Sequence, residues 1–130
     1  MTEQALNTSI GNFFRGIKAD VCRVENGVGA GMPDINICLL GMEVWIESKI
    51  HLGSRGVLLR KEQYAWGLRR ANAGGSVFVV AFDETARYHV WHYPHFQVVP
   101  VAGDKYVRIS SEPQTMGLLS QVKKILFPCV

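Results

Sequence analysis

Three residues near the middle of the chain carry side chains that could perform hydrolysis: Asp34, Glu47 and Lys49. Glu47 and Lys49 are two positions apart in an apolar run, so on a β-strand their side chains point to the same face. Asp34 begins the preceding strand-like run, and a hairpin would place that point beside the end of the following strand. The spacing therefore predicts two carboxylates and one ammonium at one end of a sheet.

This combination is suited to phosphodiester chemistry assisted by a metal ion. Carboxylate oxygens are the hard ligands that Mg²⁺ prefers, and Mn²⁺ accepts the same ligands. A metal ion held there would lower the pKa of a bound water and neutralise charge that develops on phosphorus. The ammonium of Lys49 would stabilise that charge or orient the water. We assign Lys49 an electrostatic role first, and the role of general base only if metal or substrate makes it release its proton.

The elements that must position these residues follow from hydrophobic spacing. Helices alternate with a mixed set of strands, which favours a small α/β fold. Gly41 separates two strands of an antiparallel hairpin, and Gly74 and Gly75 end a helix. In chain order we expect a helix over 3–18, strands over 20–25, 35–40 and 42–49, a helix over 59–73, strands over 76–82, 87–93 and about 106–109, and a helix over 110–127 capped by Ser110 or Ser111.

The residues around Asp34 and Glu47 resemble a known family. Asp34, the triplet Glu47-Ser48-Lys49 and the glycine-rich lead-in are similar to the PD-(D/E)xK nuclease superfamily. More narrowly, the segment GAGMPDINICLLGMEVWIESK followed by Gln63 looks like the stand-alone VRR-NUC domains of phages and bacteria. The resemblance covers about residues 3–82 and implies a restriction-endonuclease-like αβββαβ core with a mixed sheet flanked by helices. Residues 94–130 carry no family signal and would add a strand and a C-terminal helix to a single nuclease domain of residues 1–130, whose core spans about 3–93.

The resemblance also implies roles for individual residues. Asp34 and Glu47 would be metal ligands, and Lys49 the catalytic lysine. Gln63 would support the site from the second helix. Many relatives place a glutamate of the first helix near the metal, and Glu3 is the candidate here. The main-chain carbonyl of Ser48 is a candidate further ligand, with its side chain on the opposite face of the strand.

The function implied is a Mg²⁺-dependent endodeoxyribonuclease, with Mn²⁺ as a substitute, selective for branched DNA such as Holliday junctions. The resemblance implies a role in recombination or repair, with a phage as a candidate source. One site per chain must pair with a second to cut two strands symmetrically, so we expect a homodimer. No part of the sequence forms a separate recognition domain, so we expect the shape or backbone of DNA to be recognised. The alternatives are a restriction-type or RNA-cleaving nuclease, a non-enzymatic nucleic-acid-binding module and a protein-interaction domain.

Contacts with DNA are expected from two loops and one helix. Gly29 and Gly31 would let the DNA backbone approach closely, although a glycine-rich turn without another role explains them too. His51, Arg55, Arg60 and Lys61 would contact phosphate, with Arg69 and Arg70 further along the same basic segment. The alternative is a solvated helix face and an exposed loop histidine. Tyr64 and Trp66 are expected in the core or an interface.

Composition narrows the class of protein further. Hydrophobic residues make up 48% of the chain, which excludes disorder. The net charge of +3 permits a nucleic-acid partner without demanding one. No apolar run reaches the roughly 20 residues of a membrane span, and no basic segment followed by an apolar one opens the chain. We therefore expect a cytoplasmic protein (in the host cytoplasm if a phage encodes it) with no membrane partner and no small-molecule cofactor.

Cysteine and histidine do not suggest a second metal site. The three cysteines lie far apart in the chain and are expected as reduced thiols. His89, His92 and His95 invite a zinc interpretation, but strand residues three positions apart face opposite sides of a sheet. We therefore expect ordinary strand and loop histidines.

Overall fold

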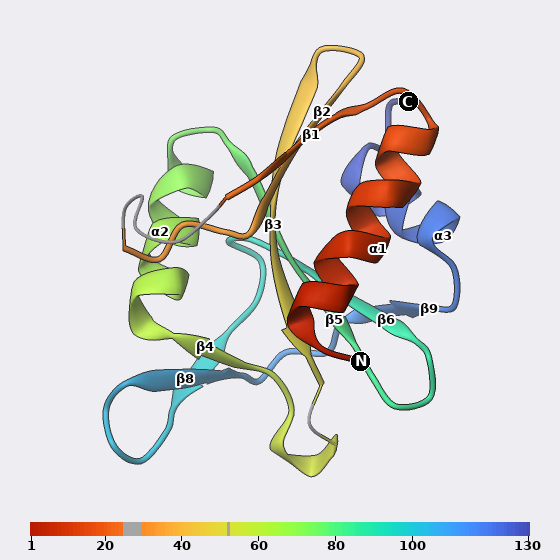
Figure 1. The fold of residues 1–130 in the computed structure, drawn as a ribbon. Coiled ribbons are helices and arrows are strands. Elements are labelled where there is room, and N and C mark those ends of the chain that lie inside the picture. Colours follow the sequence, from red (N-terminus) through yellow and green to blue (C-terminus); the bar gives the residue numbers. More distant parts are fainter. Residues whose placement is uncertain (25–29, 52) are drawn as a thin grey trace.

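The computed structural model describes residues 1–24, 30–51 and 53–130, and within them a large mixed sheet forms the centre of the molecule (Figure 1). Its strand order is β1-β2-β3-β5-β6-β9. The central pair β3 and β5 is parallel, and every other neighbouring pair is antiparallel. The strands are β1 (Asp20–Arg23), β2 (Ile35–Leu39), β3 (Met42–Ile50), β5 (Ser76–Phe82), β6 (Tyr88–His92) and β9 (Gln114–Met116).

Helices cover both faces of this sheet (Figure 1). The helices α1 (Glu3–Gly16) and α3 (Leu119–Leu126) lie on one face, and α2 (Lys61–Asn72) lies on the other. Strand β5 shows both layers, because Phe78 and Val80 join the core under α1 whereas Val77 and Val79 join the core under α2. This alternation confirms that the apolar run 76–82 is a strand buried on both faces.

The predicted αβββαβ order of the core is confirmed, with one further short strand before the second helix, and so is the hairpin. One face of β3 carries Glu43, Trp45, Glu47 and Lys49, a mixture that is typical of an exposed face. In the structure this face is largely covered, and only Glu43 is exposed. Trp45 packs against Trp66 of α2 with 5.2 Å between ring centroids, and the guanidinium of Arg70 lies over both rings. The α2 layer therefore covers this face as well, and Glu47 points into a buried environment.

A second, smaller sheet was not predicted. It has the order β4-β8-β7, with β4 (Leu58–Arg60), β7 (Val98–Pro100) and β8 (Tyr106–Ile109). The predicted start of the second helix at residue 59 is wrong, because Leu59 pairs with Val107 and is fully buried. Helix α2 begins at Lys61, and a short 3-10 turn (Gly53–Arg55) precedes β4.

The first part of the predicted C-terminal helix is also a strand. Residues 114–116 form β9, which pairs with the open edge of β6, and α3 begins only at Leu119. The amide oxygen of Gln121 accepts the Gly117 and Leu118 N–H groups at the start of α3. Ser110 and Ser111 therefore do not cap the helix, and the hydroxyl of Ser111 instead accepts the N–H of Gln97.

No helix within the described residues (1–24, 30–51 and 53–130) is long and apolar enough to cross a membrane.

Candidate active site

One cleft of about 440 Å³ brings together the side chains that the sequence singles out for catalysis and metal binding. They come from the start of α1, the residue before β2, the end of β3 and the first turn of α2. The small sheet closes the cleft from one side. Its lining residues are Glu3, Asp34, Glu47, Lys49, Ile50, Leu58, Arg60, Gln63 and Tyr106.

Asp34 is fixed opposite Glu47 by the hairpin. Ile35 pairs with Ile46 in the β2–β3 ladder, so continuing the register by one residue sets Asp34 across from Glu47. The main-chain N–H of Ser48 donates to Asp34 Oδ2 over 2.9 Å, which ties this side chain to β3. The predicted meeting of two carboxylates at one end of the sheet therefore follows directly from strand register.

Glu47 is a buried acid with only part of its hydrogen-bonding capacity used. Its side chain is 3% exposed, and its Oε2 accepts a hydrogen bond from Gln63 Nε2 over 3.2 Å. Its Oε1 has no partner among the residues that the structure describes. Burial, reinforced by the negative charge of Asp34 and opposed by Lys49, raises the pKa of Glu47 to about 9. The free protein therefore favours the protonated acid, and a cation beside it would favour the carboxylate.

Gln63 joins Glu47 to the second helix. It is the third residue of α2, and its Oε1 accepts the main-chain N–H of Arg60 over 2.9 Å. This bond satisfies one of the donors that every helix leaves unpaired at its N-terminus. Gln63 is 8% exposed, so the same amide caps α2 and holds Glu47 inside the protein.

Lys49 and Ser48 occupy opposite faces of β3. Lys49 is half-buried and lines the cleft beside Glu47, as the spacing predicts. Ser48 is fully buried, and strand alternation places its side chain on the α1 face with Ile46. The main-chain N–H of Ser48 donates to Asp34. The role of the Ser48 carbonyl as a metal ligand stays a prediction.

The donor set fits a divalent cation of the Mg²⁺ type. Within the described ranges no three His, Cys, Asp or Glu side chains form a complete metal-binding group by themselves. Asp34 and Glu47 supply two carboxylates, and Glu3 lines the same cleft at the start of α1. A cation would satisfy the unpartnered Oε1 of Glu47 and offset the repulsion between the two acids. Ions such as Mg²⁺ need few protein ligands, because they keep several waters and bind substrate phosphate.

The glycine loop has a different role from the one predicted. Gly31 is buried with φ +83°, and a Cβ at this position would lie 2.1 Å from the carbonyl oxygen of Glu62. Gly31 therefore lets the loop pack against the first turn of α2, and it offers no surface to DNA. Gly29, the other predicted DNA contact of this loop, lies outside the described residues.

The basic residues predicted to bind DNA are divided between three places. Arg60 lines the candidate cleft with its side chain half exposed, 3.8 Å from Glu62. Lys61 forms an ion pair with Asp104, so its charge is matched outside the cleft. His51 and Arg55 line a neighbouring cleft of about 580 Å³, which shares Ile50 with the first.

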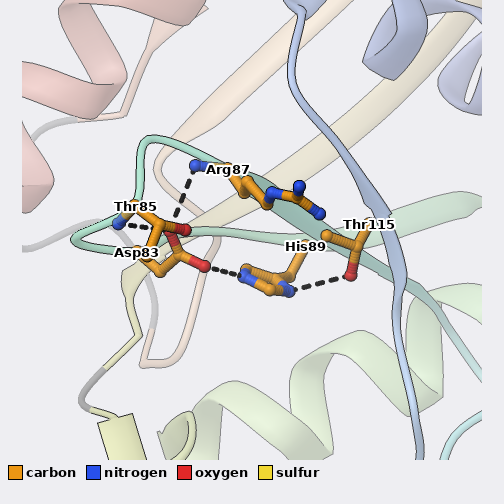
Figure 2. A network of polar contacts seen from close by, with 5 residues as sticks. All are labelled: Asp83, Thr85, Arg87, His89 and Thr115. Carbon is orange, nitrogen blue, oxygen red and sulfur yellow. Dashed lines mark hydrogen bonds and ion pairs between the residues drawn. The ribbon is translucent and has the colours of Figure 1, made fainter.

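His89, beside His51, belongs to a polar network that the sequence did not reveal (Figure 2). The ring of His51 lies against that of His89, with 4.9 Å between centroids and a tilt of 33° between the ring planes. His89 contacts Asp83 Oδ2 over 2.6 Å through Nε2 and the Thr115 hydroxyl over 3.0 Å through Nδ1. Burial opposes ionisation of Asp83, but hydrogen bonds from Thr85 and His89 outweigh it and hold the pKa of this carboxyl well below its usual range. The network ties the β5–β6 turn to β9, and its sign in the sequence is an acid in a turn shortly before the first histidine of the next strand.

His89 and His92 lie on opposite faces of the sheet, as strand alternation predicts. His89 is opposite Ala81, a residue of the α2 layer, whereas His92 stacks on Phe78 of the α1 layer at 4.4 Å. Sequence reasoning assigned no site role to three residues that line the candidate cleft, namely Ile50, Leu58 and Tyr106, and of these only Tyr106 carries a polar group. It belongs to the C-terminal extension, where the residue pattern indicated a strand but no function.

The fold is a mixed α/β fold, in which helices cover both faces of a mixed sheet. No protein-family model matches the chain, and no curated protein is similar to it in sequence. Among solved structures, it is similar to Hjc of Archaeoglobus fulgidus, a Holliday junction resolvase from an archaeal hyperthermophile, with a TM-score of 0.59. The match covers 83% of this chain and 87% of the resolvase at 12% sequence identity, so the likeness is one of fold.

Proposed function

We propose that this protein is a metal-dependent nuclease that hydrolyses phosphodiester bonds in DNA. The observation that carries the proposal is the meeting of Asp34, Glu47 and Lys49 in one open cleft, where an oxygen of Glu47 has no partner within the described parts of the chain. The PD-(D/E)xK resemblance of the same residues and the resolvase-like fold also support it.

In this proposal Asp34 and Glu47 hold Mg²⁺, with Glu3 and the Ser48 carbonyl as candidate further ligands. When bound, the ion would supply an activated water and neutralise charge on the phosphate. Lys49, on the same face as Glu47, stabilises negative charge that develops on the phosphate oxygens. Gln63 keeps Glu47 directed at the cleft through its 3.2 Å hydrogen bond.

We infer branched DNA as the substrate class, because the fold is similar to that of a Holliday junction resolvase. The finer proposals are a VRR-NUC-type enzyme, encoded by a phage and active as a homodimer in the cytoplasm during recombination or repair. A homodimer would bring two clefts to the two strands that a symmetric cut requires. We further propose that residues 1–130 act as one domain, since β8 and β9 of the extension pair with β4 and β6.

The test is cleavage of a labelled four-way junction beside a matched linear duplex, with Mg²⁺, Mn²⁺ or EDTA. We expect metal-dependent cleavage of the junction, abolished by Lys49→Ala and retained by Lys124→Ala, an exposed lysine of α3. Equal cleavage of both DNAs would retain the nuclease and reject the selectivity for branches. A folded protein that binds DNA but cleaves neither substrate would favour an RNA-cleaving enzyme or a binding module.

A further inference from the structure

The small sheet has two faces of different character. Leu59, Val107 and Ile109 point into the core under α2. The residues between them point outward, because side chains alternate along each strand and paired residues share a face. Arg60 pairs with Tyr106, and Arg108 lies between Leu58 and Val99. These five residues are called the outer face of the small sheet: Leu58, Arg60, Val99, Tyr106 and Arg108.

The outer face combines positive charge with an exposed aromatic ring. Tyr106 is 41% exposed, which is high for so large a side chain in the middle strand of a sheet. Arg60 and Arg108 add two guanidinium groups, and strands β4, β7 and β8 contain no acidic residue. Of the nearest acids, Glu62 lies 3.8 Å from Arg60, and Asp104 is paired with Lys61. Guanidinium groups around an exposed ring are typical of surfaces that bind single-stranded nucleic acid.

This face is continuous with the candidate active site. Leu58, Arg60 and Tyr106 line the same cleft as Asp34 and Glu47. The small sheet is also fixed to α2, because the N–H of Lys61 donates to the Lys105 carbonyl over 3.1 Å and its side chain pairs with Asp104. Two residues further on, Gln63 holds Glu47. The position of the outer face relative to the carboxylates is therefore set by the first turn of α2.

We propose that the outer face binds a single DNA strand on its way into the cleft, which rests on the proposed nuclease function. The ring of Tyr106 stacks on an unpaired base, and Arg60 and Arg108 bind phosphates on the same strand. A continuous duplex keeps its bases paired and stacked, so this contact requires a strand that is single or locally opened. The positive charge of this face favours the anionic backbone of DNA as its ligand.

The test measures binding of a fluorescent single-stranded oligonucleotide and of a four-way junction in EDTA, where no cleavage occurs. We expect Tyr106→Ala and Arg108→Ala each to weaken binding roughly tenfold, and Tyr106→Phe to bind like the wild type. Arg108→Ala should also reduce the salt dependence of binding, by a slope of about 0.7 for one lost phosphate contact to a single strand. Arg15→Ala, which removes an exposed arginine of α1, serves as the matched control.

Thermal unfolding of each variant shows that the fold is intact. Wild-type affinity in both Tyr106→Ala and Arg108→Ala would overturn the proposal, even if the enzyme cleaves DNA normally. If Tyr106→Phe loses as much DNA affinity as Tyr106→Ala, the stacking contact is overturned and the Tyr106 hydroxyl makes the contact with DNA. Failure of the nuclease function itself would appear separately, as absence of cleavage by the wild type with Mg²⁺.

Discussion

The side-chain amide of Gln63 connects the buried acid Glu47 to the start of α2. Its nitrogen donates to Glu47 Oε2 over 3.2 Å, and its oxygen accepts the Arg60 N–H over 2.9 Å. One residue therefore caps the helix and positions the acid, so helix packing and site geometry are coupled through a single side chain.

Replacing Gln63 should affect stability and activity together. We expect Gln63→Ala to lower the free energy of unfolding by about 1–2 kcal/mol through the lost cap and to reduce the cleavage rate at least tenfold. Gln121→Ala is the matched control, because Gln121 caps α3 in the same way but lies outside the cleft. It should lose stability and keep activity. Urea unfolding and junction cleavage measure the two effects, and full activity in Gln63→Ala would reject the positioning role.

Glu47→Gln should stabilise the metal-free protein while abolishing cleavage. Burial raises the pKa of Glu47 from 4.5 to about 9, so between these values the folded state keeps a proton that the unfolded state releases. Stability of the wild type in EDTA should therefore fall as pH rises through this range. The neutral amide removes this cost, so the stability of Glu47→Gln in EDTA should change little with pH over the same range. Thermal unfolding against pH measures it, with Glu43→Gln on the exposed part of β3 as the control.

Binding of the metal ion should release a proton. Because Glu47 must ionise to act as a ligand and its pKa is raised to about 9, Mg²⁺ competes with a proton at neutral pH. The apparent affinity for Mg²⁺ should rise by up to about tenfold per pH unit below this pKa. Calorimetric titration in buffers of different ionisation enthalpy would reveal the proton. An affinity that does not change between pH 6 and about 8 would show that Mg²⁺ displaces no proton from Glu47.

The Asp83–His89 contact should stabilise the protein down to mildly acidic pH. The lowered pKa of Asp83 means that its contribution is complete above the usual aspartate value of 3.8 and is lost as pH falls below it. We expect Asp83→Asn to lower the melting temperature by several degrees at pH 7, with the difference from the wild type shrinking towards pH 3. Identical melting profiles of the two proteins would show that the network contributes nothing to the fold.

Gly31 and Gly41 allow backbone conformation to be separated from close packing. Both have φ near +80°, but only Gly31 would place a Cβ within 4 Å of a neighbour, at 2.1 Å from the carbonyl of Glu62. We expect Gly41→Ala to cost about 1–2 kcal/mol and Gly31→Ala to cost clearly more. Chemical unfolding compares them, and equal losses would show that the loop shifts away from α2 without penalty.

The hairpin that creates the site could be predicted because its signals are local. Ile35 and Ile37 alternate on one strand, Val44 and Ile46 on the next, and Gly41 marks the turn between them. Strand pairing then sets Asp34 opposite Glu47 without further information. Helix α2 and the buried strand β5 were predictable for the same reason.

The remaining features depend on contacts between residues far apart in the chain. The residues that follow Leu59 in the sequence have the apolar spacing of a helix. Leu59 itself belongs to a strand only because it pairs with Val107. The His89–Thr115 contact exists because β9 lies beside β6, which no local pattern indicates. The position of Tyr106 in the cleft likewise follows from the small sheet, whose three strands come from two distant parts of the sequence.

All three tryptophans, Trp45, Trp66 and Trp91, belong to the core between the large sheet and α2. Their emission therefore reports on the layer that supports the candidate cleft and is blind to the layer of α1 and α3. If the two layers open separately, circular dichroism would register the loss of α1 while tryptophan fluorescence remains native. The protein thus carries a built-in optical probe for the half of the molecule that holds Glu47 and Gln63.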